Sequence, residues 1–413
     1  MRVMRIGTAF FMTEQRYRNL VTTFLAGMLV LHLVLAWNAR DLVRKGYPDF
    51  TIFYSAGKIV RQGLGSQLYN EAVQYRAQQE FASGVTIRQG PLPYNHPPFE
   101  ALLFVPLTWL PYFPAYLVWN LLSLLILAWV GTLLRPHILI LRRVAAPLWL
   151  LACLAFSPVY IAFLQGQDII VLFLLYCLTY TSLKKNAEFA AGCYLGLGLF
   201  RFHLVVPFVF MMLFRRKLKF VSGVGLVGIL LTMVSLAMVG GSGTIHYVQY
   251  VWHVEQTMGG GAIVPAAMPN LRGLIDTILP GRAPQLLREV ATVVPSLALL
   301  LIASLKWRKA KLEEEVDLGF ALCLVVTVLV SYHTFAYDMT LLLLPMALVT
   351  RGIHGEWVDR FLLIPVITLF CGPLLLFLWL HLGHAEVLSL VLLAWAWAIM
   401  KKMSRLALPE GSQ

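Results

Sequence analysis

The chain has 413 residues, of which 59% are hydrophobic and only 13% are charged. A soluble domain of this size could not hide so much apolar surface, so the composition excludes an ordinary water-soluble protein and indicates a polytopic membrane protein. The net charge of +13 does not indicate nucleic-acid binding, because the basic residues stand in short clusters between apolar runs and not along one soluble face.

Apolar runs of about 17 to 25 residues, long enough to cross a hydrocarbon core of roughly 30 Å as a helix, recur along the chain. The first follows four arginines and has no small-residue cleavage site at its end, so it predicts a retained span and not a signal peptide. The expected spans lie near residues 18–37, 112–134, 144–163, 168–183, 188–200, 203–214, 218–240, 289–305, 316–333, 338–350, 360–380 and 385–401. This gives about twelve spans in one all-α membrane domain, residues 1–413, with both termini cytoplasmic at the cell's inner (cytoplasmic) membrane.

The basic clusters require one broken hairpin. Lys184 and Lys185 and the run RRKLK at 215–219 are both expected on the cytoplasmic side, so the chain between them must cross an even number of times. Two short arms, 188–200 and 203–214, satisfy this condition, with Arg201 and His203 at their turn. Because each arm is short for a full crossing, the turn is expected within membrane depth, beside protein or a wet cavity.

Two outer segments, 38–111 and 241–288, are too long for simple connections and are expected to be functional or to carry helices of their own. In the first, the apolar spacing over residues 52–60 predicts an amphipathic helix on the outer leaflet. The stretch HPPFEALLFVPLTWLPYF is apolar but interrupted by prolines, which favours a re-entrant or interfacial piece over a span. The five cysteines stand in apolar runs without a CxxC pair, so free thiols are expected.

Ionisable side chains at membrane depth are costly, so each is a candidate functional residue. Those expected at the outer boundary are Asp49, His96, Glu100, Asp168, Arg201, His203, His333 and Asp338. Their gathering on one side predicts an outward-facing polar cavity. No P-loop and no DxD pair in an outer loop is present, so a metal-independent site is the simpler expectation.

Asp49 follows the first expected span and is the candidate general base, because a carboxylate within hydrogen-bond reach can take the proton of an attacking hydroxyl. The alternative is an N-cap of the amphipathic helix, since aspartate favours that position. Both interpretations can hold at once.

Arg201 and His203 could hold a phosphate, because a guanidinium makes forked, charge-assisted contacts with phosphate oxygens. The alternative is an arginine that pairs with Asp168 or reaches the interface. In SYHTFAYDM, His333 and Tyr337 are four residues apart and are expected on one helical face, as functional groups or as helix caps and cross-helix hydrogen-bond partners.

Several segments together resemble glycosyltransferase family 87, the polyprenol-phosphate-mannose-dependent α-mannosyltransferases of the membrane-embedded GT-C class. The segments are DFTIFYSAGKIVRQGLGSQLY, YNHPPFEALLFVPLTWLP, QGQDIIVLFLLY, AGCYLGLGLFRFHLVVPFVFMMLFRRK, MPNLRGL and SYHTFAYDMTLLLLP, which span roughly residues 45–350. Where the family often has Lys-Pro, this chain has Arg201-Phe202, and where it often has Trp-Asp-His, this chain has Tyr337-Asp338-Met339.

The resemblance implies a GT-C-like bundle and an inverting hexosyltransferase, with Asp49 as the base. It would move a sugar, by family default mannose, from a polyprenyl-phosphate donor to a lipid or glycan hydroxyl outside the cytoplasmic membrane. The candidate donor- and acceptor-binding residues are Tyr54, His96, Gln167, Arg201, His203, Asn270, Arg272, His333, Tyr337 and Asp338. No metal, no cofactor, no nucleic acid and no obligate protein partner is implied beyond the two substrates and membrane lipids. The rival interpretations are a multi-pass secondary transporter or lipid flippase, and a non-catalytic scaffold.

Overall fold

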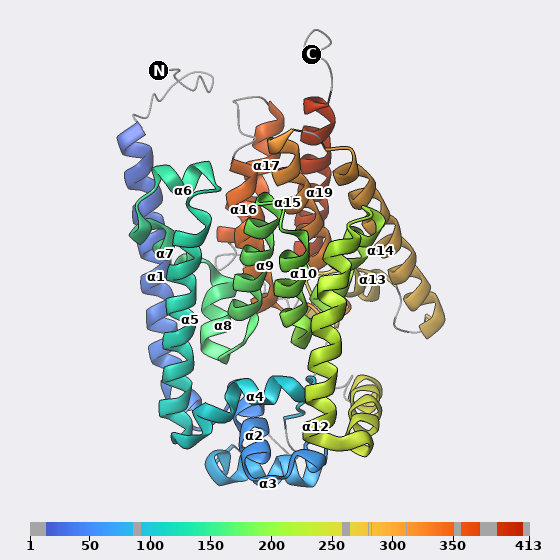
Figure 1. Cartoon of the computed structure of the whole chain (residues 1–413). Coiled ribbons are helices and arrows are strands. Elements are labelled where there is room, and N and C mark those ends of the chain that lie inside the picture. The colour runs from blue at the N-terminus through green and yellow to red at the C-terminus, as the bar shows by residue number, and fades with distance from the viewer. Residues whose placement is uncertain are drawn as a thin grey trace.

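The computed structural model of the chain describes residues 14–85, 92–257, 265–279, 281, 283–310, 312–350, 357–371 and 386–407. Over these ranges the backbone forms helices joined by turns and contains no strand (Figure 1). The expected all-α class is therefore confirmed for the part of the chain that the structure covers.

The α-helices are α1 Glu14–Arg44, α2 Phe50–Arg61, α3 Glu71–Ala82, α4 Ala101–Phe104, α5 Tyr112–Leu134, α6 Leu139–Arg143, α7 Ala146–Ala155, α8 Ser157–Gln165, α9 Ile169–Lys184, α10 Glu188–Gly196, α11 Phe202–Phe214, α12 Leu218–Thr257, α13 Leu271–Ile278, α14 Gln285–Arg308, α15 Glu313–Val330, α16 Leu343–Val349, α17 Trp357–Phe370 and α19 Val387–Leu406. The short 3₁₀ helices are η1 Gly65–Gln67, η2 Pro98–Glu100, η3 Val105–Trp109, η4 Leu197–Arg201, η6 Pro265–Ala267 and η7 Ala336–Leu342.

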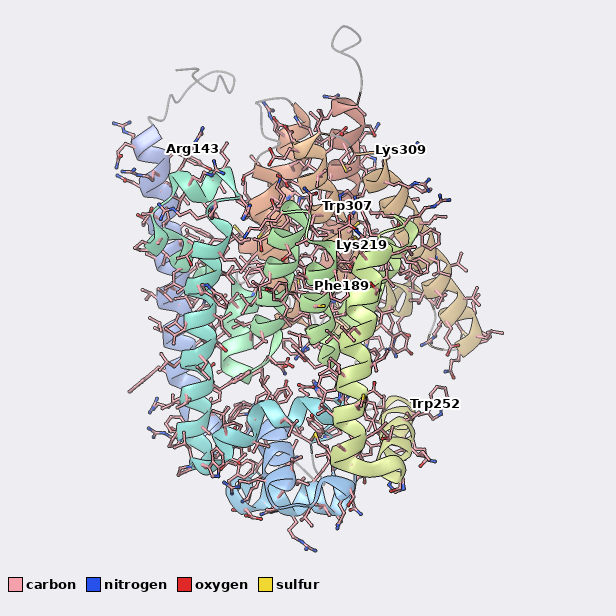
Figure 2. The ribbon with its side chains drawn as sticks, in the orientation of Figure 1. Arg143, Phe189, Lys219, Trp252, Trp307 and Lys309 are labelled. Atoms are coloured by element: carbon pink, nitrogen blue, oxygen red, sulfur yellow. The ribbon has the colours of Figure 1, made fainter. Side chains whose placement is uncertain are left out.

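The helices form two layers. In Figure 1 the long helices stand roughly parallel in a bundle, and α2, α3 and α4 lie across the end of it that is opposite to the two termini. Arg143 and Lys309 lie at the end that carries the termini, whereas Trp252 lies toward the opposite end (Figure 2).

Six helical stretches are long and apolar enough to cross a membrane, or seven if the pair α7 and α8, bent by 73°, counts as one span. Large apolar side chains on the outer surfaces of α1 and α14, such as Leu33 and Val294, are exposed, as expected where lipid is the solvent. The protein is therefore a polytopic membrane protein. The expected number of about twelve spans goes beyond what helix length and composition show.

The predicted hairpin at Arg201 is present. The helical stretch Glu188–Phe214 has 27 residues and would be about 40 Å long if it were straight. Lys217, just beyond its end, nevertheless forms an ion pair with Glu188 at its beginning. The chain must therefore fold back on itself, and the backbone leaves helical geometry at Arg201, where φ is −113° and ψ is 58°.

The long segment 241–288 carries helices of its own, as expected. Helix α12 changes direction at Gly240, whose φ of 71° lies in the region that favours glycine. The first arm of α12 therefore ends at the same residue as the predicted span 218–240. The second arm runs to Thr257, and η6 and α13 follow after residues 258–264, which lie outside the described part.

The predicted amphipathic helix exists as α2, but its expected position on the outer leaflet is wrong. Phe53 and Ile59 on its apolar face are fully buried, because α3, α4 and η3 cover that face. Gly57 allows the close approach, since a Cβ there would lie 2.9 Å from the backbone of Phe104. The predicted apolar face of the helix is present, but other helices of the protein cover it in place of lipid.

The proline-interrupted stretch after His96 is not a span. It forms the short helices η2, α4 and η3, too short to cross a bilayer. The five cysteines are free thiols, as predicted. The expected span 360–380 is described only as far as residue 371, one residue after the end of α17 at Phe370. Residues 372–380 lie outside the described part.

Candidate active site

Asp49 lies at the start of α2, at the N-cap position, but its side chain makes no capping hydrogen bond. Its Oδ2 instead accepts a hydrogen bond of 2.7 Å from Gln167 Nε2, and its backbone N–H donates to Gln165 Oε1 over 3.0 Å. The alternative N-cap role of the carboxylate is therefore wrong, although the position is that of a cap. The carboxylate is half-buried and faces the bundle.

The turn QGQD between α8 and α9 supplies both glutamines. Gly166 ends α8 in the left-handed region with φ of 62°, and a Cβ there would lie 2.7 Å from the side chain of Phe50, the first residue of α2. A glycine is required for both reasons. The close approach brings Gln165 and Gln167 beside Asp49, which is more than a hundred residues earlier in the chain.

Arg201 is the centre of a buried ionic network. Its Nε donates to Asp168 Oδ1 over 2.6 Å, one terminal nitrogen donates to Asp338 Oδ1 over 2.9 Å, and the other donates to Gln167 Oε1. Every nitrogen of the guanidinium thus contacts a protein acceptor, and the side chain is only 3% exposed. Of the two interpretations offered by the sequence, the pairing of Arg201 with Asp168 is confirmed.

Gln167 connects the base candidate to this network, because it donates to Asp49 through its nitrogen and accepts from Arg201 through its oxygen. The amide therefore has a fixed orientation between an anion and a cation. A chain of hydrogen bonds runs from Asp49 to Asp168 and Asp338.

The expectation that His333 and Tyr337 share one helical face is wrong. Residues 331–335 are not helical, and Tyr337 belongs to the 3₁₀ helix η7 that follows. Asp338, for which the sequence suggested no cap role, caps the start of η7: its Oδ2 accepts a 2.8 Å hydrogen bond from the backbone N–H of Phe335. The Arg201 guanidinium lies 5.3 Å from the centre of the Tyr337 ring.

His96, Glu100 and Asp168 form a second cluster. It shares Asp168 with the Arg201 network. Glu100 Oε2 lies 2.8 Å from His96 Nδ1, and the ligand-type atoms of all three residues lie within 4.8 Å of one another. Burial lowers the pKa of His96 to about 4, which favours the neutral imidazole. Burial, followed by the charge of Asp168, raises the pKa of Glu100 well above its ordinary value.

His203 and His333 meet at the edge of the network, with ring centroids 6.2 Å apart and both side chains partly exposed. They come from the first turn of α11 and from the non-helical segment after α15, respectively. Two partly exposed imidazoles therefore lie close to the charged groups of the Arg201 network.

Asn270 and Arg272 support the same non-helical segment from α13. Asn270 caps α13 through Oδ1 and donates to the carbonyl of Ser331 over 2.8 Å, and the Arg272 guanidinium lies 3.9 Å from the centre of the Tyr332 ring. Arg272 also faces a cleft of about 190 Å³ between α13 and α14. The cleft lies beside the Arg201 network and not within it.

Tyr54 is not brought to the site. Its hydroxyl donates to the carbonyl of Leu110, and its ring packs in the aromatic core of the outer layer. Sequence reasoning missed Gln165 as a member of the site, named Glu100 only as a boundary group, and named Asp168 as a boundary group and as a possible partner of Arg201. The rarity of carboxylates in apolar surroundings was the available signal for the last two.

The fold and this centre define an integral membrane protein that carries a buried network of acids, one arginine and two partly exposed imidazoles between its helix bundle and the layer of α2, α3 and α4. The model of glycosyltransferase family 87 matches residues 94–331, which is more than half of the 413-residue chain. The chain therefore belongs to glycosyltransferase family 87 and is a membrane glycosyltransferase. The curated proteins and the solved structures that were compared with the chain give no match.

Proposed function

We propose that this protein transfers a sugar, with mannose as the family default, from a polyprenyl-phosphate donor to a hydroxyl of a lipid or glycan on the extracytoplasmic side. The observation that supports this best is Asp49, a carboxylate held by Gln167 at the junction of the bundle and the outer layer. It is not used as a helix cap, which is the ordinary reason for an aspartate at that position.

In the proposed reaction Asp49 takes the proton of the acceptor hydroxyl as its oxygen attacks the anomeric carbon. The bond from that carbon to the phosphate oxygen breaks, and the lipid phosphate leaves with the electron pair. Attack from the face opposite to the leaving group inverts the configuration at the anomeric carbon. Gln167 keeps the Asp49 carboxylate in position through a hydrogen bond of 2.7 Å.

The leaving phosphate is assigned to His203, His333 and Arg272, because these basic side chains are partly exposed and the rings of His203 and His333 lie 6.2 Å apart. Arg201 was a candidate for this role, but all of its nitrogens contact Asp168, Asp338 or Gln167. We assign it to positioning of Gln167, with Tyr337 packed over its guanidinium. Asn270 positions the segment before His333 through the carbonyl of Ser331.

The same proposal extends to the topology. The apolar helical segments α1, α5, α7 with α8, α9, α10, α11, α12, α14, α15, α16 with η7, α17 and α19 correspond to the twelve expected spans. We propose that they cross the cytoplasmic membrane in a GT-C-like arrangement, with the termini inside and the layer of α2, α3 and α4 outside. A cysteine-labelling scan with an impermeant reagent tests this, with labelling of a cysteine at position 76 only from outside as the expected result.

The test of the activity is transfer of labelled mannose from polyprenyl-phosphate-mannose by the purified protein in lipid, with total lipid extract as acceptor. We expect a labelled product whose anomeric configuration is opposite to that of the donor. Uptake or flipping of the donor by proteoliposomes, without any transfer by the folded protein, would instead support the transporter interpretation. Retention of the configuration would contradict the direct-displacement mechanism while leaving the transferase class intact.

A further inference from the structure

The polar centre brings together more acidic groups than basic ones. Three buried carboxyl groups, those of Glu100, Asp168 and Asp338, lie around Arg201, and each is at most 2% exposed. In the described part of the chain, Arg201 is the basic side chain that forms ion pairs with Asp168 and Asp338. Buried charge requires compensation, so this arrangement has room for a further positive charge or a proton.

Two of the acid oxygens lack a hydrogen-bond donor. Glu100 Oε1 and Asp168 Oδ2 are buried and accept no hydrogen bond from any group in the described residues, whereas the second oxygen of each has a partner in His96 or Arg201. The two carboxyl groups also lie within hydrogen-bonding reach of each other. One oxygen of each carboxyl group and one ring nitrogen of His96 lie within 4.8 Å of one another, so the three side chains border the same small space.

We propose that His96, Glu100 and Asp168 bind one divalent cation with a preference for oxygen ligands, of the Mg²⁺ or Mn²⁺ type. Carboxylate oxygens are ligands that Mg²⁺ and Mn²⁺ prefer, and the imidazole nitrogen of His96 would complete a set of three protein ligands. A cation about 2.1 Å from each ligand atom places those atoms roughly 3 to 4 Å apart. The three side chains, whose ligand-type atoms lie within 4.8 Å of one another, need only small rotations to reach that geometry.

The sequence offered no sign of this site, because the ligands come from distant segments and no DxD pair exists. His96 and Glu100 lie four residues apart across the start of η2, and Asp168 precedes α9. The interpretation that competes with a cation is a single proton shared between Glu100 and Asp168. A cation and that proton exclude each other, so the two interpretations predict opposite binding results.

The cation also has a role in the proposed function, and this part of the inference rests on that function. A donor phosphate is anionic, and a centre with an excess of carboxylates would repel it. Three carboxylates and one guanidinium leave two negative charges, and a divalent cation next to Arg201 would neutralise them. We expect it to lie on the donor side, where it assists His203 and His333.

The experiment is a titration of the full-length protein in lipid nanodiscs with Mn²⁺ after removal of metals with a chelator, followed by the electron paramagnetic resonance signal of free Mn²⁺. We expect one bound Mn²⁺ per chain. Glu100→Gln should weaken binding by about tenfold or more, because it removes a ligand. Glu80→Gln is the matched control and should bind as wild type, since Glu80 pairs with Lys58 on the outer layer, away from the cluster.

A second measurement does not depend on a buried substitution. His96 is partly exposed, so His96→Gln should fold, and in wild type the electron spin echo of bound Mn²⁺ should show coupling to one imidazole nitrogen. That coupling should be absent from His96→Gln. Wild-type protein that is folded and takes up no Mn²⁺ at about 1 mM, within the range of weak metal sites, would overturn the proposal in favour of the shared proton. Bound Mn²⁺ that Glu100→Gln leaves unchanged would overturn it as well.

Transfer activity separates this inference from the proposed function. Mn²⁺ binding at this cluster without sugar transfer would support the cation site and contradict the function. Full transfer by chelator-treated protein that binds no Mn²⁺ would support the function and contradict the site.

Discussion

The two ends of α9 carry the same ionic arrangement in different surroundings. At its last residue, Lys184 lies between Glu313 and Asp317, at 2.7 Å and 2.9 Å. At the other end, Asp168 stands just before the first residue of α9 and pairs with Arg201 at 2.5 Å. Arg201 also pairs with Asp338 at 2.9 Å. At each end of α9, one basic side chain thus lies between two carboxylates.

The difference is access to solvent. The Glu313 side chain is 61% exposed, whereas those of Asp168 and Asp338 are 0% and 1% exposed. Water can stabilise the charge at the Lys184 end, but protein groups alone must do so at the Arg201 end. A partly solvated cluster suffices to tie α9 to α15, whereas a closed one, beside Asp49 and two imidazoles, is the arrangement expected of a reactive centre.

The largest difference in stability should separate Arg201→Met from Lys184→Met. Arg201→Met leaves Asp168 and Asp338 buried without their cation, which should cost about 3–5 kcal/mol of unfolding free energy. Lys184→Met should cost about 1–2 kcal/mol, because Tyr180 still donates to Asp317 and water reaches Glu313. Thermal unfolding of both variants in the same nanodiscs measures the difference, and equal losses would contradict the comparison.

Gln167→Leu should mainly affect catalysis. It breaks the bridge between Asp49 and Arg201 without removing a charge, so we expect kcat to fall by about 10- to 100-fold through loss of positioning, with little change in KM. Gln165→Leu is the matched variant, because Gln165 contacts only the backbone N–H of Asp49 in this network, and its effect on kcat should be smaller. A rise in KM with unchanged kcat for Gln167→Leu would show that Gln167 serves substrate binding instead.

Glu100→Gln should have the smallest effect on stability. In metal-free buffer its unfolding free energy should stay within about 1 kcal/mol of wild type, since the amide keeps the shape of the carboxyl group and adds an N–H that can donate to Asp168. Mn²⁺ should raise the unfolding temperature of wild type but not that of the variant, because a ligand stabilises only the state that binds it. A variant that Mn²⁺ stabilises as strongly as wild type would place the cation elsewhere.

Much of the fold could be predicted from the sequence, because apolar runs and basic clusters report directly on the membrane. The hairpin at Arg201 is the clearest case, since the parity of the charge clusters required it and the Glu188–Lys217 pair shows it. The covering of α2 by protein could not be predicted. An apolar helical face has the same spacing whether lipid or another helix covers it.

The candidate site divides in the same way. The cost of ionisable groups in apolar surroundings singled out Asp49, Asp168 and Arg201, and the structure brings them together. The hydrogen bonds that join these residues connect segments that are far apart in the sequence. The left-handed turn at Gly166 brings Gln167 beside Asp49, and the non-helical break before η7 separates His333 from Tyr337. No local spacing contains that information.

The central claim is that Asp49 is the base of a sugar transfer, and the most direct test is the kcat of Asp49→Asn for transfer from polyprenyl-phosphate-mannose. The account predicts a fall of about 10²- to 10⁴-fold, as for loss of a general base, in a protein with the unfolding temperature of wild type. Asp41→Asn is the control, because Asp41 is exposed on α1, and it should keep wild-type activity. A folded Asp49→Asn protein with the kcat of wild type would contradict the account.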